Sequence, residues 1–316
     1  MKVLLFTHEQ DIDGMGSIII AKQIFKEFDY VTCKSGEINQ KVEETINNGM
    51  IYEYDFIFVT DLCIREPLLS QIDADDKLKN KILILDHHKT ELENNKYSFV
   101  NVVVQNELGL ASGTSLFYDY MKERGFLKPS PSLSDLAELT RQYDTWEWKT
   151  KYNNPKARML HILFEQLGYK RYIEEINKIV TDNNQSFEFS EGHLKLINDF
   201  DRELADTLNR ILADMMPYTL EIDNRNYKIG YVQTLYQYRN ELAEEVRKNN
   251  IHDIDLIAMI ITDMPSISYR SIKDVDVSIV STYFGGNAGH KEASASPKDN
   301  EKFIEVFSLL NVKKGA

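Results

Sequence analysis

Cysteine is scarce in this sequence, with only Cys33 and Cys63 among 316 residues. Two isolated cysteines supply neither a disulfide framework nor the paired spacing of a thiolate zinc site. Both lie in or beside apolar segments. We therefore expect buried, inert thiols and a protein that works in the reducing cytoplasm.

Long apolar runs and an excess of basic residues are also absent. No apolar run approaches the roughly 18 residues of a membrane span, and the first run meets His8 and Asp11 too early for the apolar core of a signal peptide. The formal net charge of −13 disfavours long-range attraction to nucleic acid or to anionic lipid. It remains compatible with a short anionic substrate held by a local cationic site, such as bound metal. We expect no membrane partner.

The first hundred residues alternate short apolar runs with helical periodicity. The strand candidates are residues 3–6, 31–34, 56–60, 82–85 and 99–104, and amphipathic stretches such as 18–28 and 67–78 lie between them. Near-continuous apolar strands interleaved with helices indicate a parallel sheet covered on both faces.

The rest of the chain is first helical and then mixed. Helices are predicted at 112–124 and from a cap at Ser134, followed by a long amphipathic helix within 187–216. Strand periodicity then returns at 218–222, 227–232, 256–261 and 267–271, with helices at 239–248, 274–283 and 301–310. The prediction is an α/β protein with an N-terminal parallel-sheet domain (1–185), a helical linker (186–216) and a smaller C-terminal α/β domain (217–316).

Three of the predicted strands end in polar residues that can carry chemistry. They are His8, Asp11 and Asp13 after the first strand, Asp61 after the third, and Asp86, His87 and His88 after the fourth. A single Asp at such a turn is commonly a helix cap, but carboxylates gathered this tightly repel one another unless a cation neutralises them. Oxygen-rich sites with some imidazole and no thiolate suit Mn²⁺ or Mg²⁺, with Zn²⁺, Co²⁺ or Fe²⁺ as alternatives.

The carboxylates outnumber the ligands that one ion needs, which favours two ions sharing a bridging carboxylate. Ion pairs about 3.5–4 Å apart clamp both oxygens of an in-line phosphoryl displacement. The ligand types therefore point to hydrolysis of phosphate esters.

Four ordered motifs resemble those of the DHH phosphoesterase superfamily. The tripeptide 86–88 gives that superfamily its name, 11–14 resembles its first motif, 60–61 its second and 143–144 its fourth. The glycine loop 285–290, with Ala293-Ser294 after it, resembles the associated DHHA1 domain. The motifs extend from Thr7 to Ala295, and the whole is most similar to stand-alone members that degrade short oligonucleotides.

The resemblance implies a two-metal site. His8, Asp11 and Asp61 would hold one ion, and Asp13, Asp61, His87 and Asp144 the other, with Asp61 bridging. The implied ions are two Mn²⁺, with Mg²⁺ or Co²⁺ as substitutes, and a hydroxide between them as nucleophile. His88 would be catalytic, facing the scissile phosphate, and Asp86 would orient the neighbouring imidazole.

The resemblance also implies substrate-binding residues in the second domain: Arg270, Ser271, Gly289 and His290. Two features depart from the pattern. Two residues separate His8 from Asp11 where many relatives have three, and Asn287-Ala288 lengthens the glycine loop. These departures bear on the ligand role of His8 and on the placement of His290.

Several residues near the motifs have two interpretations. Trp146 and Trp148 could stack a base, although packing of a helix around Asp144 explains them as well. Arg141 could reach a phosphate or form a salt bridge. His161, His193 and His252 lie outside every motif and are read as ordinary histidines.

The expected function is Mn²⁺-dependent removal of mononucleotides from short single-stranded oligonucleotides, mainly RNA, from the 3′ end. A homodimer is one arrangement that the sequence leaves open. Alternatives within the enzyme class are a cyclic- or linear-dinucleotide phosphodiesterase, a 3′,5′-bisphosphonucleoside phosphatase and a RecJ-type exonuclease on DNA. A binding module that has lost its ions is the alternative outside it, although such a module would be expected to lack motif aspartates that are present here.

Overall fold

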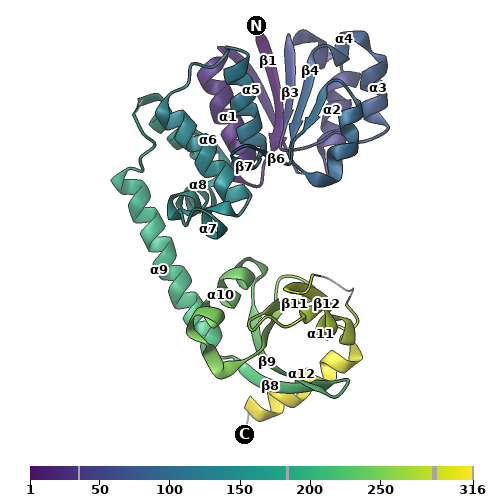
Figure 1. The fold of residues 1–316 in the computed structure, drawn as a ribbon, viewed down its shortest axis with the longest axis vertical. Helices are drawn as coiled ribbons and strands as arrows, with labels where there is room; N and C mark the ends of the chain where they lie inside the picture. Colours follow the sequence, from purple (N-terminus) through teal and green to yellow (C-terminus); the bar gives the residue numbers. More distant parts are fainter. Residues whose placement is uncertain (35, 183–184, 287–289, 315–316) are drawn as a thin grey trace. The chain divides into compact units, whose positions relative to one another are not determined.

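The computed structural model describes residues 1–34, 36–182, 185–286 and 290–314, with side chains up to residue 308 (Figure 1). The chain divides into two compact units, Met1–Asn198 and Asp199–Ala316. The division lies inside helix α9 (Glu191–Ala213), which belongs to the stretch predicted as a linker. Each unit is described by itself below.

The first unit is built on a five-stranded sheet in the order β2-β1-β3-β4-β5, with all neighbours parallel. Its strands are β1 (Lys2–His8), β2 (Glu27–Cys33), β3 (Phe56–Thr60), β4 (Ile82–Asp86) and β5 (Val100–Val102). This confirms the predicted N-terminal parallel sheet. The strand order places β1 between β2 and β3, so the chain moves in opposite directions along the sheet from β1 to β2 and from β2 to β3. Open α/β sheets bind ligands at such a switch point.

Helices cover both faces of this sheet. In Figure 1, α1 (Ile12–Ile24) and α5 (Gly113–Glu123) lie on one side, and α2 (Ile38–Asn47), α3 (Leu68–Ala74) and α4 (Asp76–Lys79) on the other. Because side chains alternate along a strand, Leu4 and Phe6 join the core beneath α2 and α3, while Val3 and Leu5 are buried on the opposite face. Both faces of the sheet are therefore buried, which explains why its strands are almost continuously apolar.

The remaining helices of this unit are α6 (Pro131–Asp144), α7 (Glu147–Thr150) and α8 (Pro155–Asp182), which bends at Gly168. Two predicted helix boundaries were wrong. Helix α6 begins at Pro131 with Ser130 as its cap, rather than at Ser134, because proline is well suited to the first position of a helix. The amphipathic stretch predicted at 18–28 extends too far, because α1 ends before residue 25 and residues 27–33 form β2.

The second unit contains a mixed five-stranded sheet in the order β12-β11-β10-β9-β8. Its strands are β8 (Met216–Ile222), β9 (Arg225–Thr234), β10 (Leu256–Ile261), β11 (Ser266–Ser271) and β12 (Ala293–Pro297). Only β9 and β10 are parallel neighbours. The turn between β8 and β9 is Asp223-Asn224, both with positive φ, as the primed hairpin turns require. The predicted second α/β domain is confirmed.

Helices α10 (Arg239–Asn249), α11 (Val277–Tyr283) and α12 (Glu301–Lys314) complete this unit. Strand β12 was not predicted, because its Ala-Ser alternation lacks the usual apolar strand residues. Its inward side chains are Ser294 and Ser296, and the Ser296 hydroxyl lies 2.9 Å from the Tyr269 hydroxyl. Hydrogen bonds thus replace apolar packing on this strand.

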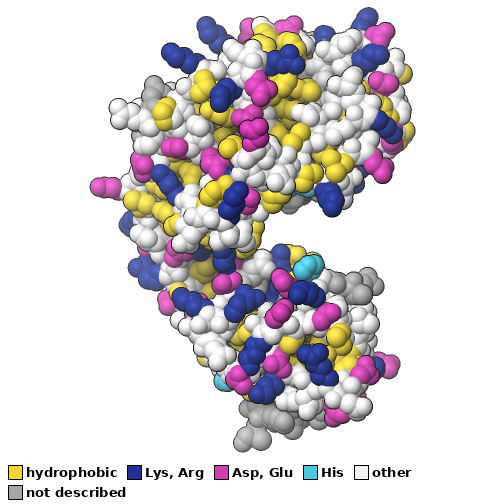
Figure 2. Space-filling view, viewed as in Figure 1, with side chains coloured by type: hydrophobic (Ala, Val, Ile, Leu, Met, Phe, Trp, Pro, Cys, Tyr) yellow, Lys and Arg dark blue, Asp and Glu magenta, His cyan; other side chains and the backbone are white. Residues whose placement is uncertain are grey.

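Among the helices that the structure describes, none combines the length and the apolar character needed to cross a membrane. On the face shown in Figure 2, basic and acidic side chains are interspersed.

Candidate metal centre

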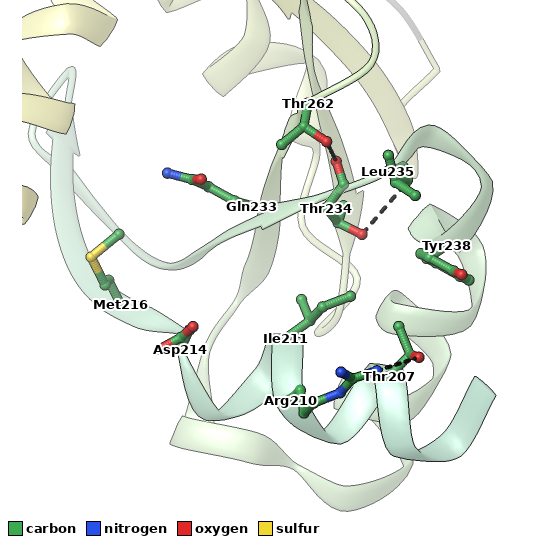
Figure 3. A pocket seen from close by; sticks show the side chains of 10 residues that line it. All are labelled: Thr207, Arg210, Ile211, Asp214, Met216, Gln233, Thr234, Leu235, Tyr238 and Thr262. Carbon is green, nitrogen blue, oxygen red and sulfur yellow. Dashed lines mark hydrogen bonds between the residues drawn. The ribbon is translucent and has the colours of Figure 1, made fainter. Parts of the chain in front are cut away.

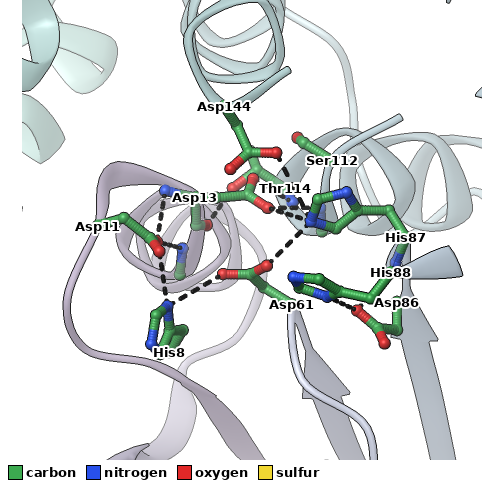
Figure 4. Close-up of polar contacts among 12 residues, drawn as sticks. His8, Asp11, Asp13, Asp61, Asp86, His87, His88, Ser112, Thr114 and Asp144 are labelled. Atoms are coloured by element: carbon green, nitrogen blue, oxygen red, sulfur yellow. Dashed lines mark hydrogen bonds and ion pairs between the residues drawn. The ribbon is translucent and has the colours of Figure 1, made fainter. Parts of the chain in front are cut away.

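The polar residues at three strand ends of the first sheet converge on one place (Figure 4). His8 ends β1, Asp61 follows β3, and Asp86 ends β4. Parallel strands bring their carboxyl ends to the same edge, so residues far apart in sequence meet there. Asp13 on α1 and Asp144 on α6 complete the cluster, and α5 supplies backbone amides to it.

The loop after β1 is shaped by Asp11 and Gly14. One carboxylate oxygen of Asp11, Oδ1, accepts hydrogen bonds from the backbone N–H groups of Asp13 (3.1 Å) and Gly14 (3.0 Å), which caps α1. A Cβ on residue 14 would lie 1.9 Å from the carbonyl oxygen of His8. Only glycine allows this close approach, which turns the chain so that His8 and Asp11 lie together.

Asp13 is fully buried and is held by the start of α5. Its two carboxylate oxygens accept hydrogen bonds from the backbone N–H groups of Gly113 (2.6 Å) and Thr114 (2.8 Å). The Thr114 hydroxyl also donates to the carbonyl oxygen of Asp13. The sequence predicted that a helix begins near residue 112, but not that its first amides bind the Asp13 carboxylate. Amides at a helix N-terminus stabilise a carboxylate, so α5 fixes the position of this charge.

Asp61 occupies the centre of the cluster. Its backbone is left-handed, with φ of 59°, a conformation that Asp tolerates better than most residues. A Cβ on Gly113 would lie 2.6 Å from the Cβ of Asp61, so glycine is needed here for α5 to approach. The side chain is buried, and its Oδ2 has no hydrogen-bond partner among the described residues.

Three groups of candidate ligands meet at this centre, and in each group the ligand atoms lie within 4.8 Å of one another. Two of them match the predicted ligand sets: His8, Asp11 and Asp61, and Asp13, His87 and Asp144. The third consists of Asp61, Asp86, His87 and His88. The Nε2 atom of His87 lies 3.1 Å from Asp61 Oδ1 and 3.5 Å from Asp144 Oδ2. Asp61 therefore contacts residues of both predicted sets.

His8 adopts an orientation that leaves one ring nitrogen available. Its Nδ1 lies 2.6 Å from Asp11 Oδ2 and 3.7 Å from Asp61 Oδ2. Its Nε2 is buried and has no hydrogen-bond partner in the described part of the chain. The spacing that departs from the family pattern thus still places His8 beside Asp11.

The electrostatics of the cluster favour a bound cation. Burial, followed by repulsion from Asp13, Asp11 and other carboxylates, raises the pKa of Asp61 well above its usual value. The pKa of Asp144 is raised for the same two reasons. Burial also acts to raise the pKa of Asp11, but its hydrogen bond and charge interaction with His8 prevail and lower it.

Carboxylates that repel one another in a dry site cost free energy unless a cation compensates them. Unpartnered buried atoms on His8 and Asp61, together with an oxygen-rich donor set, fit hard divalent ions such as Mn²⁺ or Mg²⁺.

Asp86 and His88 form a separate pair at the edge of the cluster. The Oδ1 atom of Asp86 lies 2.8 Å from His88 Nδ1 and accepts a hydrogen bond from the His87 backbone N–H at 2.8 Å. Asp86 is fully buried, whereas the His88 side chain is 52% exposed. The bond to Asp86 raises the pKa of His88, although burial opposes it. Asp86 therefore fixes the His88 ring and the backbone of His87.

Arg141 forms the salt bridges that were one of its two interpretations. Its side chain is fully buried, and its guanidinium donates to Glu138, to Glu147 and to the carbonyl oxygen of Leu110. These bonds tie the end of α6 to α7 and thereby fix the turn that carries Asp144.

Three of the residues predicted to bind substrate in the second unit, Arg270, Ser271 and His290, lie at one end of β11 and β12. Arg270 pairs with Ala293 across the strands, and Ala293 forms a bridge with His290, which is exposed. Arg270 donates to Ser268 Oγ (2.8 Å) and to Asn240 Oδ1 (3.3 Å). Gly289 lies outside the described residues.

Ser271 has its hydroxyl engaged inside the unit. It is buried, and its Oγ accepts a hydrogen bond from the Val275 backbone N–H at 2.9 Å. Arg239, which the sequence did not single out, lies near Arg270; burial and then the charge of Arg239 lower the pKa of Arg270. Two neighbouring guanidinium groups suit an anionic ligand better than either alone.

A cavity of about 450 Å³ also lies in the second unit (Figure 3). It contains none of the predicted site residues and is lined by Thr207, Arg210, Ile211, Asp214, Met216, Gln233, Thr234, Leu235, Tyr238 and Thr262.

Comparisons with known proteins agree with the motifs and the fold. A family model described as the DHH family, N-terminal domain, matches residues 2–141. The chain is 31% identical over 307 residues to oligoribonuclease NrnB from Bacillus subtilis (strain 168), covering 96% of this chain and 74% of that relative. Among solved structures, PggH, a pGpG-specific phosphodiesterase from Vibrio cholerae, is 10% identical with a TM-score of 0.53, covering 99% of each chain.

Proposed function

The chain belongs to the DHH family, and from this membership we propose that it is a metal-dependent phosphodiesterase that degrades short single-stranded oligonucleotides to mononucleotides. Its preferred substrates would be RNA oligonucleotides, shortened from the 3′ end, and its ions two Mn²⁺. The similarity to an oligoribonuclease over nearly the whole chain supports this choice among the reactions of phosphate esters.

The observation that carries the proposal is the pair of ligand groups that both include or contact Asp61. In the proposed assignment, His8, Asp11 and Asp61 hold one ion, and Asp13, Asp61, His87 and Asp144 hold the other. When bound, such ions would activate water and neutralise charge on the phosphate. A single structural ion would not need this many carboxylates.

The side chains of the protein then have distinct tasks. The amides of Gly113 and Thr114 hold the Asp13 carboxylate in place, and Asp86 holds His88 through Nδ1. This leaves the Nε2 atom of a half-exposed His88 as the ring nitrogen available to a phosphate oxygen. From that position His88 can donate a hydrogen bond to the phosphate or a proton to the leaving oxygen.

The test is hydrolysis of an end-labelled RNA pentamer by purified protein with Mn²⁺. Successive shortening to mononucleotides is expected, and the end at which the label is lost gives the polarity. Asp61→Asn is the inactive variant, and Asp119→Asn, a partly buried carboxylate on α5 outside the cluster, is the matched control. If the pentamer is left intact while a dinucleotide or a small phosphate ester is cleaved, the oligonucleotide proposal is wrong.

A matched series of RNA and DNA oligomers of increasing length sharpens the same assay. The proposal expects faster cleavage of the RNA members and of the shorter ones. Rates that rise with length, or that favour DNA, would contradict it.

A further inference from the structure

Trp146 is unusual in both backbone and exposure. Its φ of 63° is left-handed, a conformation that is a genuine outlier for a bulky side chain. Its side chain is nevertheless 44% exposed, so burial of the indole does not compensate for the strain. Strained residues of this kind gather at functional sites. Trp146 lies two positions after Asp144, whose carboxylate is 3.5 Å from His87 Nε2.

The rings beside Trp146 form an ordered row. Tyr143 stacks on His161 with centroids 4.3 Å apart and on Trp148 with centroids 6.4 Å apart. Trp146 meets Trp148 edge to face, at 5.5 Å and 75°. Trp148 is therefore the packing tryptophan of the pair, and Trp146 ends the row with much of its ring in solvent.

The turn that carries Trp146 is held rigidly. Its backbone N–H donates to the carbonyl oxygen of Tyr143 at 3.0 Å, and its own carbonyl oxygen accepts from the Lys149 N–H at 3.2 Å. The buried guanidinium of Arg141, which precedes the turn, forms a salt bridge of 2.5 Å with Glu147, which follows Trp146. A turn whose backbone is fixed in advance loses little conformational entropy when a ligand binds to it.

We propose that Trp146 is the stacking platform for a nucleobase adjoining the scissile phosphate. Any nucleobase can stack on the π-face of an exposed indole, so the contact does not depend on the base sequence of the substrate. Lys149 Nζ lies over the ring of Trp146, 5.8 Å from its centroid, and adds positive charge there. The inference rests on the proposed function, because it assigns a nucleotide to the site, and it gives that site selectivity for base-bearing phosphodiesters.

The kinetic test compares a dinucleotide with its abasic analogue, in which one base is replaced by hydrogen. The protein is expected to favour the base-bearing substrate, and Trp146→Leu to lose this preference through a KM increase of roughly 5- to 150-fold, the effect of losing one stacked base. A smaller change in kcat is expected, because stacking is made before the transition state. Trp148→Phe is the matched control and should keep the preference.

The binding test uses the fact that the sequence has only two tryptophans. In a Trp148→Phe variant loaded with Mg²⁺, AMP should quench the fluorescence of Trp146, and ribose 5-phosphate should not. The proposal would be overturned if Trp146→Leu raised KM equally for the dinucleotide and for its abasic analogue. It would also be overturned if AMP inhibited hydrolysis but left the fluorescence of Trp146 unchanged. Because quenching requires no turnover, a failure of the hydrolytic function is distinguishable from a failure of stacking.

Discussion

The two units differ in whether their candidate functional residues have hydrogen-bond partners within the protein. In the first unit, buried carboxylates repel one another, and polar atoms of His8 and Asp61 lack partners among the described residues. In the second, Ser271 and Arg270 are engaged in hydrogen bonds within their own unit. The first arrangement is incomplete without an external cation. In the second, the side chains already have partners within the unit, so only their exposed groups can contact a ligand.

The largest expected effect comes from removing the central charge of the first unit. Asp61→Asn should lower the rate of oligonucleotide hydrolysis by more than about 100-fold, since residues that merely support metal ligands already cost 10- to 100-fold. In chelator, the same variant should unfold at a higher temperature than the wild type, because a buried carboxylate with a raised pKa destabilises the fold at neutral pH. A lower melting temperature for the variant in chelator would contradict the charge-repulsion account.

Binding of ions should stabilise the first unit alone. At a Mn²⁺ concentration one hundred times the dissociation constant, each bound ion adds about 2.7 kcal/mol to the free energy of unfolding. Hydrogen exchange should slow at β1, β3 and β4 on addition of Mn²⁺ and stay unchanged at β8 and β10. Asp61→Asn should reduce this protection, and equal slowing in both sheets would remove the contrast between the units.

His161 offers a second way to test how the first unit handles charge. Burial lowers its pKa from 6.5 to about 4, so the folded protein keeps it neutral where the unfolded chain would take up a proton. Stability should therefore fall between pH 6.5 and 4, by about 3 kcal/mol at its limit. The free energy of unfolding of His161→Phe, measured in chelator, should fall less over this range. An identical decrease for variant and wild type would show that other groups account for it.

The smallest effects are expected in the second unit, where Arg270 and its neighbour Ser271 should respond differently. Arg270→Ala should raise KM by roughly 10-fold or more, as expected when a charge-assisted hydrogen bond is lost. Ser271→Ala should leave KM unchanged and cost about 1 kcal/mol of stability, because its hydroxyl bonds Val275. A KM increase with Ser271→Ala would show that Ser271 also contacts the substrate, as the sequence predicted.

Much of the fold could be predicted because the signals are local. Apolar runs such as residues 3–6 and 56–60 mark parallel strands, and polar residues at their ends mark the functional edge. The family resemblance drawn from the motifs is confirmed. The assignment of ions to particular ligands stays a prediction, although the structure brings those side chains together.

What could not be predicted depends on long-range contacts. No local pattern shows that Asp13 is held by the amides of Gly113 and Thr114, or that Gly113 is required beside Asp61. The burial of Ser271 is equally invisible, since its partner Val275 was predicted to lie in a helix beginning at residue 274 and lies instead in the loop before α11. The exposure of Trp146 is not visible in the sequence either, and its role as a stacking residue stays a proposal.

The contact between Asp13 and the start of α5 also bears on when the protein becomes competent during folding. Contacts between distant segments form late, because a long loop must close first. Since the proposed ligands run from His8 to Asp144 and Asp13 is fixed only once α5 docks, a growing or partly folded chain would hold scattered carboxylates without an assembled centre. The topology thus keeps the proposed ligands apart until the segments from β1 to α6 have folded together.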